Sequence, residues 1–193
     1  MKIILASSSE YRKRLLAPLI SSVICISPKI DESILPDETA KDYVSRLALE
    51  KAETIANDQN NALVIGSDQC AVLNKRIITK PNTPENAFQQ LKASSGNTVT
   101  FYTGLSVINT KTNSKQISCE HYRVTFRKLS DKQIKAYLEK DQPYDCAGSF
   151  KAEGLGITLF EKLHGDDPNT LIGLPLIKLT TLLMKEGFDV LSA

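Results

Sequence analysis

Residues 63–72 read Leu63-Val64-Ile65-Gly66-Ser67-Asp68-Gln69-Cys70-Ala71-Val72. The apolar residues at both ends of this stretch predict a buried β-strand over residues 62–73. Its middle is interrupted by residues that bury poorly, and an ionised Asp68 there requires a cation, a metal ion or a hydrogen-bond donor beside it. A local capping or turn role for Asp68 is the alternative. The stretch therefore predicts a strand of the core with a polar site within it.

Asp68 and Gln69 raise a geometric question, since successive side chains of a regular strand point to opposite faces of the sheet. Both can face one site only if the strand bends or bulges. Gly66 would permit such an irregularity.

The rest of the chain alternates between helical and extended patterns around this strand. Apolar spacing and capping residues predict helices over residues 10–19, 39–57, 83–94, 131–141 and 174–187. Short apolar or alternating runs predict further strands over residues 2–6, 23–26, 77–78, 98–109, 117–129 and 157–163. This order predicts an α/β fold, with a mixed β-sheet and flanking helices, in a single domain over residues 1–193.

The composition excludes several functional classes. The 193 residues are 41% hydrophobic and 24% charged, which excludes a disordered chain. The 24 basic and 22 acidic residues leave a net charge of +2, too small for nonspecific nucleic-acid binding. No run approaches the roughly 18 apolar residues of a membrane span, and the first apolar run is shorter than a signal-peptide core. We expect a cytoplasmic protein with neither nucleic acid nor membrane as partner.

The cysteines and histidines offer little support for metal or triad chemistry. Four cysteines stand far apart with no C-x-x-C pair, and we expect them to be free thiols buried as small hydrophobes. His121 and His164 are the only histidines, and their spacing is not that of metal ligands. The common phosphate-binding loops and the G-x-S-x-G nucleophile motif are absent from the sequence.

Several charged residues nevertheless suit a phosphate ligand. Ser7, Ser8 and Ser9 precede a predicted helix whose N-terminus and Arg12 could bind an anion, although plain helix capping is the alternative. Lys51 lies on the apolar stripe of its helix, where a charge is costly unless it is paired or extends to water.

Three weaker candidates complete this set of charges. Pro81 pushes Lys80 into an extended conformation, and glycines beside Glu153 allow close approach of a ligand. Glu32 lies with Asp31 on a predicted loop, where ordinary surface acids are the alternative. Carboxylates, cations and a serine-capped helix together suit a polyphosphate that carries a divalent metal.

The motifs, taken in order, resemble those of the Maf family of nucleoside triphosphate pyrophosphatases over about residues 2–187. The segments that carry the resemblance are Leu5-Ala6-Ser7-Ser8-Ser9-x-x-Arg12, Asp31-Glu32-Ser33, Arg46-Leu47-Ala48-x-x-Lys51-Ala52, Gly66-Ser67-Asp68-Gln69, Thr79-Lys80-Pro81, Ser95-Gly96, Phe101-Tyr102-Thr103-Gly104 and Ala147-Gly148-Ser149-Phe150-Lys151-x-Glu153-Gly154.

The resemblance implies a mixed-sheet fold, similar to ITP pyrophosphatases, with two lobes around a nucleotide cleft. It implies hydrolysis between the α and β phosphates with a divalent cation, Mg²⁺ or Mn²⁺, as cofactor. Asp68 would be the general base, and Glu32 with Asp68 would hold the metal. The phosphates would be bound by Arg12, Lys51 and Lys80, together with Ser7 and Ser8. A homodimer is also implied.

Two bacterial branches of the family differ at a few positions. The branch that hydrolyses UTP and dTTP typically reads G-A-D-T, with Arg at the position of Tyr11 and Gln at that of Glu153. This chain has Gln69 after Asp68, and it resembles the branch that acts on 7-methyl-GTP. Tyr11, Gln69 and Glu153 are expected to select the base. The alternatives are a UTP/dTTP pyrophosphatase and a non-catalytic nucleotide-binding regulator of cell division.

Overall fold

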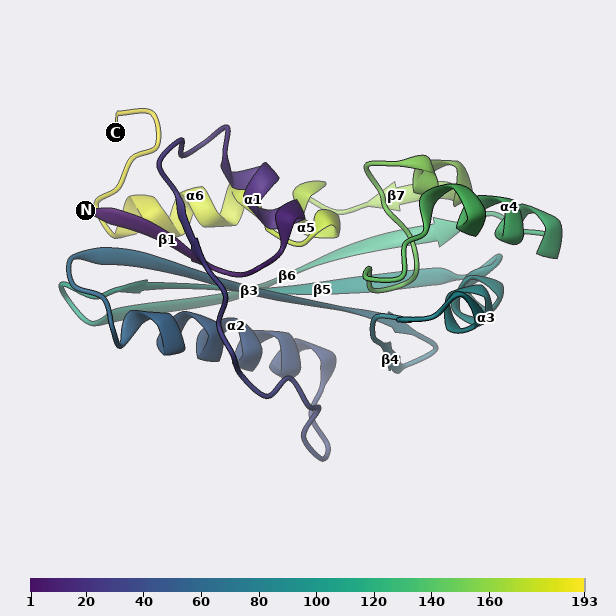
Figure 1. Cartoon of the computed structure of the whole chain (residues 1–193), viewed down its shortest axis with the longest axis horizontal. Helices are drawn as coiled ribbons and strands as arrows, with labels where there is room; N and C mark the ends of the chain where they lie inside the picture. The colour runs from purple at the N-terminus through teal and green to yellow at the C-terminus, as the bar shows by residue number, and fades with distance from the viewer. Residues whose placement is uncertain (193) are drawn as a thin grey trace. The chain divides into compact units, whose positions relative to one another are not determined.

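The computed structural model describes residues 1–192 and contains a mixed seven-stranded sheet (Figure 1). Six strands follow the order β2-β1-β3-β5-β6-β7, and β4 pairs with β3. Their bounds are β1 (Lys2–Ala6), β2 (Ile24–Ile26), β3 (Ala62–Leu73), β4 (Arg76–Ile78), β5 (Thr98–Asn109), β6 (Ser114–Phe126) and β7 (Phe160–His164).

The strand pairings include both orientations. β1 runs parallel to β2 and to β3, and in the second pairing Ala6 stands opposite Gly66. β4 is antiparallel to β3, and β7 is antiparallel to β6 with a register shift at Thr125 and Phe126. The expected mixed sheet is therefore confirmed.

The helices begin at residues that satisfy their free backbone N–H groups. Ser9, Thr39 and Thr83 each accept a hydrogen bond from the third residue after them, and Ser130 forms a complete capping box with Gln133. The helices are α1 (Glu10–Leu16), α2 (Ala40–Ala56), α3 (Pro84–Ser94), α4 (Asp131–Asp141), the 3₁₀-helix η1 (Leu155–Leu159), α5 (Asn169–Ile172) and α6 (Leu176–Lys185).

The chain divides into two compact units, as the expectation of two lobes requires. The first unit comprises residues 1–68 and 103–120 and the chain from residue 173 onward. The second comprises residues 69–102 and 121–172. Three of the boundaries fall inside long strands of the sheet, so β3, β5 and β6 each contribute residues to both units.

The first unit has a three-layer core. Figure 1 shows α2 on one face of the sheet and α1 with α6 on the other. Alternate β1 residues serve the two layers, because Ile3 and Leu5 pack with α1 and α6 while Ile4 and Ala6 pack with α2. A strand covered on both faces reads as a continuous apolar run, which is why β1 shows no alternation in sequence.

Two glycines let α2 lie close to the sheet. A Cβ atom added to Gly66 on β3 would lie 2.0 Å from the carbonyl oxygen of Ala48, and one added to Gly104 on β5 would lie 2.0 Å from that of Val44. The β1–β3 pairing keeps an even register from Lys2 and Ala62 up to Ala6 and Gly66. Gly66 is needed for the close approach of α2.

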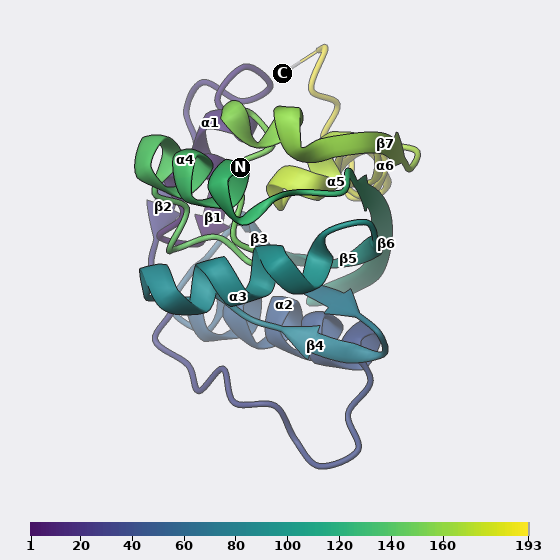
Figure 2. The same cartoon turned by 90° about the vertical axis from the view of Figure 1, so that its right-hand side faces the viewer.

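The second unit is built around an aromatic cluster. Phe101, Phe126, Phe150 and Phe160 meet in edge-to-face pairs with ring centroids 4.8 to 5.7 Å apart. α3 packs beside α4 (Figure 2), and Lys92 Nζ on α3 lies 3.1 Å from Asp131 Oδ2 on α4. Phe150 comes from the glycine-rich segment and fixes that segment to the core.

The structure corrects the prediction at the end of the chain. The strand expected over residues 157–163 is a 3₁₀-helix up to Leu159, followed by β7. The helix α5 begins at Asn169, where no helix was predicted, and the expected last helix begins at Leu176 and ends at Lys185. Gly173, with φ of +116°, separates α5 from α6, because a positive φ cannot continue a right-handed helix.

The cysteines also differ in part from the expectation. All four are free, as predicted. Cys70 is buried, whereas Cys25 is exposed and Cys119 and Cys146 are half-buried. Within residues 1–192, no helix is both long enough and apolar enough to cross a membrane.

We expect Gly104→Ala to destabilise the protein by about 1–3 kcal/mol or more, because the new methyl group meets the α2 backbone and forces the helix away from β5. Urea unfolding at equilibrium measures the effect. Gly187→Ala is the control, since Gly187 has φ of +77° but nothing within 4 Å of an added Cβ. That substitution adds backbone strain without a clash, whereas Gly104→Ala adds a clash at a residue whose φ is not positive. Unchanged stability of Gly104→Ala would contradict the proposed packing.

Candidate active site

A buried lysine lies between two carboxylates in the first unit. Lys51 Nζ is 2.5 Å from Asp68 Oδ1 and 2.7 Å from Glu32 Oε1. Only 6% of Lys51 and 7% of Asp68 is exposed, so this lysine does not extend to water. Asp68 thus has the cationic partner that its position in an apolar strand requires.

The close approach of α2 explains how Lys51 reaches Asp68. The Ala48 carbonyl lies against Gly66, and Lys51 comes one helical turn after Ala48. Asp68 follows Gly66 by two residues and therefore shares its face of β3. A larger residue at position 66 would hold α2 away and lengthen the ammonium–carboxylate distance.

Arg12 on α1 acts on the same carboxylates. Its Nε donates to the Gly173 carbonyl at 2.8 Å, and its Nη1 donates to Ser7 Oγ at 3.4 Å. Burial lowers the pKa of Arg12, and the negative charges of Asp68 and Glu32 oppose this shift. Because the ordinary pKa of a guanidinium lies far above neutral pH, Arg12 stays charged there.

The serines before α1 form hydrogen bonds within the protein beyond the helix cap that the sequence indicated. Ser7 is buried, and its Oγ accepts from the backbone N–H of Ser9 at 3.1 Å. Ser9 caps α1 through the N–H of Arg12, so the capping role is present. Ser8 is exposed, and Tyr11 is half-buried on α1. Since α1 has seven residues, the helix is too short to supply much of a dipole by itself.

The sequence did not indicate a structural role for two residues near Arg12, namely Ser67 and Gly173. Ser67, fully buried, donates its hydroxyl to the carbonyls of Gly104 at 2.8 Å and Gly173 at 2.9 Å. The Gly173 carbonyl therefore accepts from both Ser67 and Arg12. The only sequence signal was the glycine itself, two residues before Pro175, which is typical of a turn after a helix.

The second unit contains Lys80 on a segment held by side chains of α3. Gln90 Nε2 donates to the Thr79 carbonyl at 3.1 Å, and Asn86 Nδ2 donates to the Pro81 carbonyl at 3.0 Å. Lys80 is exposed, and its ammonium group bonds to none of residues 1–192. The backbone is thus fixed while the cation is available to a ligand.

Glu153 lies in the same unit on the glycine-rich segment. That segment is held by Ser149, whose Oγ donates to Gln90 Oε1 at 2.5 Å, and by Lys151, whose Nζ donates to the Asp141 carbonyl at 2.7 Å. Glu153 is exposed. Gln90 therefore fastens the segments of both Lys80 and Glu153, a role that no sequence pattern indicated.

Gln69 also belongs to the second unit, although it follows Asp68 directly. Its Nε2 donates to the carbonyls of Thr170 at 2.7 Å and Leu171 at 3.2 Å. This amide nitrogen holds α5, which the expected role in base selection did not include.

Within the first unit, the structure brings Arg12, Glu32, Lys51 and Asp68 together.

Two carboxylates of the first unit, those of Glu32 and Asp68, supply oxygen atoms of the type that magnesium and manganese ions prefer as ligands. Magnesium is usually held by one or two carboxylates, with phosphate oxygens and water completing its shell. Glu32 and Asp68 supply two such carboxylates around one point, the Lys51 ammonium. Between Met1 and Ser192 no group of three or more His, Cys, Asp and Glu side chains forms a complete metal site.

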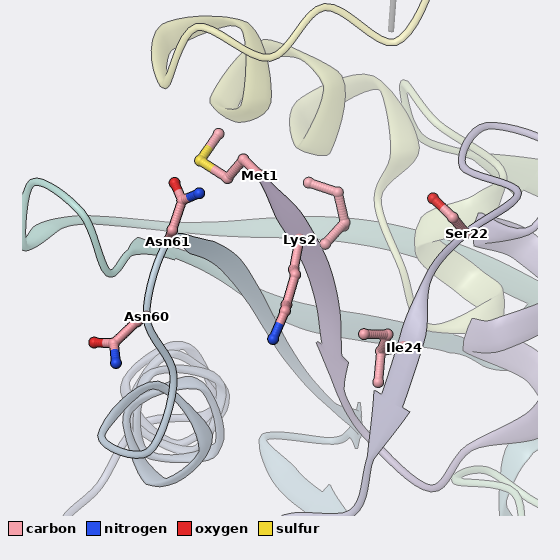
Figure 3. Close-up of a pocket in the computed structure, with 7 residues that line it drawn as sticks. Met1, Lys2, Ser22, Ile24, Asn60 and Asn61 are labelled. Atoms are coloured by element: carbon pink, nitrogen blue, oxygen red, sulfur yellow. The ribbon is translucent and has the colours of Figure 1, made fainter.

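One surface pocket lies apart from these residues. It is lined by side chains at the start of β1, on β2 and before β3 (Figure 3), namely Met1, Lys2, Ile3, Ser22, Ile24, Asn60 and Asn61. None of these is a candidate site residue.

Comparison with known proteins agrees with the ordered motifs. The model of the family described as Maf-like protein matches residues 2–186. A protein of Pseudomonas savastanoi named 7-methyl-GTP pyrophosphatase is 53% identical over 97% of this chain and 98% of its own length. One of the same name from Aliivibrio fischeri is 52% identical over 98% of both chains. The Ham1 protein of Staphylococcus aureus shares the fold, with a TM-score of 0.53, 13% identity and coverage of 96% of this chain and 100% of its own.

We expect Lys51→Met to destabilise the folded protein by about 3–5 kcal/mol, because it leaves the buried Asp68 without its counter-charge. Adding Asp68→Asn should recover part of this loss, since the unpaired charge is then absent. Urea unfolding of both single variants and the double variant gives the coupling energy. Losses that simply add would show that the two groups do not interact.

Proposed function

Since the chain belongs to the Maf family, we propose that it hydrolyses 7-methyl-GTP to 7-methyl-GMP and pyrophosphate. The observation that carries the proposal is the buried Asp68 beside two cationic side chains, Lys51 and Arg12. Relatives that are more than half identical over nearly the whole chain are named for this activity. Both units would then belong to one nucleotide pyrophosphatase domain.

Phosphate binding falls to the cations of the site. Arg12 and Lys51 of the first unit would bind the triphosphate. Lys80 of the second unit is proposed by itself as a phosphate-binding cation, because its ammonium group is exposed. Guanidinium groups bind phosphate oxygens through paired N–H donors, whereas lysine acts as a point charge. Lys51 would exchange one carboxylate partner for phosphate, which releases Asp68 to accept a proton.

The hydrolytic step requires a base beside the phosphate. Asp68 would take a proton from water as the water oxygen bonds to the phosphorus atom of the α-phosphate. The α–β anhydride bond breaks, and pyrophosphate leaves with the electron pair of that bond. Glu32 and Asp68 would hold a divalent cation, which when bound neutralises charge on the phosphates. A pure binding protein would have no need of a buried base beside these cations.

Base selection is the proposed role of Tyr11, Gln69 and Glu153. Methylation at N7 makes guanine cationic, and a cationic ring is attracted to the face of an aromatic side chain such as Tyr11. The Glu153 carboxylate accepts from the N–H groups of the guanine edge with charge assistance. Gln69 would act largely by holding α5, given its bonds to Thr170 and Leu171.

We expect the purified protein with Mg²⁺ or Mn²⁺ to release pyrophosphate from 7-methyl-GTP and to favour it over GTP, UTP and dTTP. The reason is the aromatic and acidic pair proposed for the cationic base. Chromatography of the products, with and without metal, provides the measurement. Release of inorganic phosphate and a diphosphate would contradict α–β cleavage, and preference for UTP would favour the other branch. Binding without turnover would favour a nucleotide-binding regulator.

We expect Asp68→Asn to lower kcat by roughly 10²–10⁴-fold, because the amide keeps the shape but cannot accept the proton. KM should change much less, since the phosphate-binding cations remain. Steady-state kinetics on 7-methyl-GTP measure both. Asp58→Asn, at an exposed carboxylate outside the cluster, is the control. A near-normal kcat in Asp68→Asn would assign water activation to another group.

A homodimer and a cytoplasmic location stay predictions from the resemblance and the composition. They affect none of the steps above. The nucleotide substrate is the partner that the site itself supports.

A further inference from the structure

The loop that carries Glu32 has no regular secondary structure, yet it is fastened to α2 at several points. Tyr43 on α2 donates its hydroxyl to the Glu32 carbonyl at 2.9 Å. Arg46, nearly one turn further on, donates from Nη2 to the Ser33 carbonyl at 3.0 Å. Both bonds act on backbone next to the carboxylate that faces Lys51. The same helix therefore supplies Lys51 and the anchors of its partner.

Arg46 also binds the C-terminal end of the loop, at Glu38. Its Nε and Nη2 donate to the two carboxylate oxygens of Glu38 at 2.6 and 2.8 Å. Glu38 in turn accepts from the Leu35 N–H at 3.0 Å. The side chains of Glu38 and Arg46 are only 7% and 22% exposed, so water screens the pair less than an ordinary surface pair. The bonds from Arg46 lower the pKa of Glu38, which keeps the pair charged at neutral pH.

The loop adds its own internal bonds. Asp31 Oδ1 accepts from both the N–H and the hydroxyl of Ser33, at 2.9 and 2.7 Å. Asp31 therefore shapes the turn, whereas the neighbouring Glu32 pairs with Lys51. Since 53% of the Glu32 side chain is exposed, packing does little to fix it, and its position depends on the backbone that carries it.

We propose that Arg46, assisted by Tyr43, is the positioning residue that holds the Glu32 carboxylate against Lys51 for the reaction. The proposal rests on the proposed function and extends it to a residue that touches neither substrate nor the reacting atoms. Arg46 acts through the Ser33 carbonyl and Glu38, and Tyr43 acts through the Glu32 carbonyl.

The geometry demands arginine and not merely a positive charge. One guanidinium here serves Glu38 with two N–H groups, the Ser33 carbonyl with a third and Glu50 with Nη1 at 3.2 Å. It also lies over the Tyr43 ring, with Cζ 5.8 Å from the centroid. A lysine ammonium is a single point donor and cannot hold both ends of the loop at once.

A merely structural role would predict a different pattern of kinetics. If Arg46 only stabilised the fold, its loss would lower the unfolding free energy but leave kcat of the folded enzyme unchanged. If it positions Glu32, kcat falls while KM for the nucleotide changes little, because Arg12, Lys51 and Lys80 still bind the phosphates. Partners that orient a metal-binding carboxylate typically contribute about 10–100-fold to activity or metal affinity.

The experiment compares Arg46→Lys and Tyr43→Phe with the wild-type protein. Hydrogen exchange at the amides of Ser33, Leu35 and Glu38 reports on the loop without metal or substrate, since all three N–H groups are bonded within it. Steady-state kinetics on 7-methyl-GTP with excess Mg²⁺ report on catalysis. Glu53→Gln is the matched control, because Glu53 lies on the same helix as Arg46 but pairs with Lys115 on β6.

We expect Arg46→Lys to accelerate exchange in the loop and to lower kcat about tenfold or more, with KM within about threefold. Tyr43→Phe removes one hydrogen bond and should lower kcat about two- to tenfold. Glu53→Gln should match the wild type in both measurements.

Accelerated exchange with unchanged kcat would overturn the positioning role, as would unchanged exchange in both variants. If the wild-type protein did not hydrolyse 7-methyl-GTP, the proposed function would fail. In that case loop exchange would still show whether Arg46 holds the Glu32 segment, so the two failures are distinguishable.

Discussion

The close contact between α2 and the glycines of the sheet is the constraint on which the site of the first unit depends. Gly66 and Gly104 lie under the carbonyls of Ala48 and Val44, at positions where any side chain would overlap the helix backbone. Lys51 then reaches Asp68, because Lys51 lies about one turn after Ala48 on α2 and Asp68 lies two residues after Gly66 on β3. The packing of α2 therefore affects the site, since a change in the distance between α2 and the sheet would alter the Lys51–Asp68 ion pair.

The cluster that results is costly to bury and is held by neighbours that offset the cost. An isolated carboxylate in an apolar strand would be strongly unfavourable, and a buried ion pair gives little net stability. Here Lys51 is shared by Asp68 and Glu32, while Arg12 is held by Ser7 and Gly173. Such an arrangement is typical of a site kept for binding and catalysis and not for stability.

In the second unit, side chains of α3 hold the loops in place through hydrogen bonds. Gln90 bonds to the segments that carry Lys80 and Glu153, and Phe150 anchors the glycine-rich segment in the aromatic cluster. These bonds leave the ammonium of Lys80 available for a ligand. Exposed functional groups on well-held backbone are what ligand binding without large reorganisation requires.

The sequence by itself determined the apolar strands, the capped helices, the buried setting of Asp68 and the ordered motifs of the family, because these depend on local pattern and spacing. Only the tertiary structure decided that Gly66 lets α2 approach the sheet closely. It also decided that residues 155–159 form a 3₁₀-helix, and that Arg46, Tyr43, Ser67 and Gln90 hold the site. Their partners lie on other elements, and no local pattern encodes how closely two elements pack or which carbonyl a long side chain will reach.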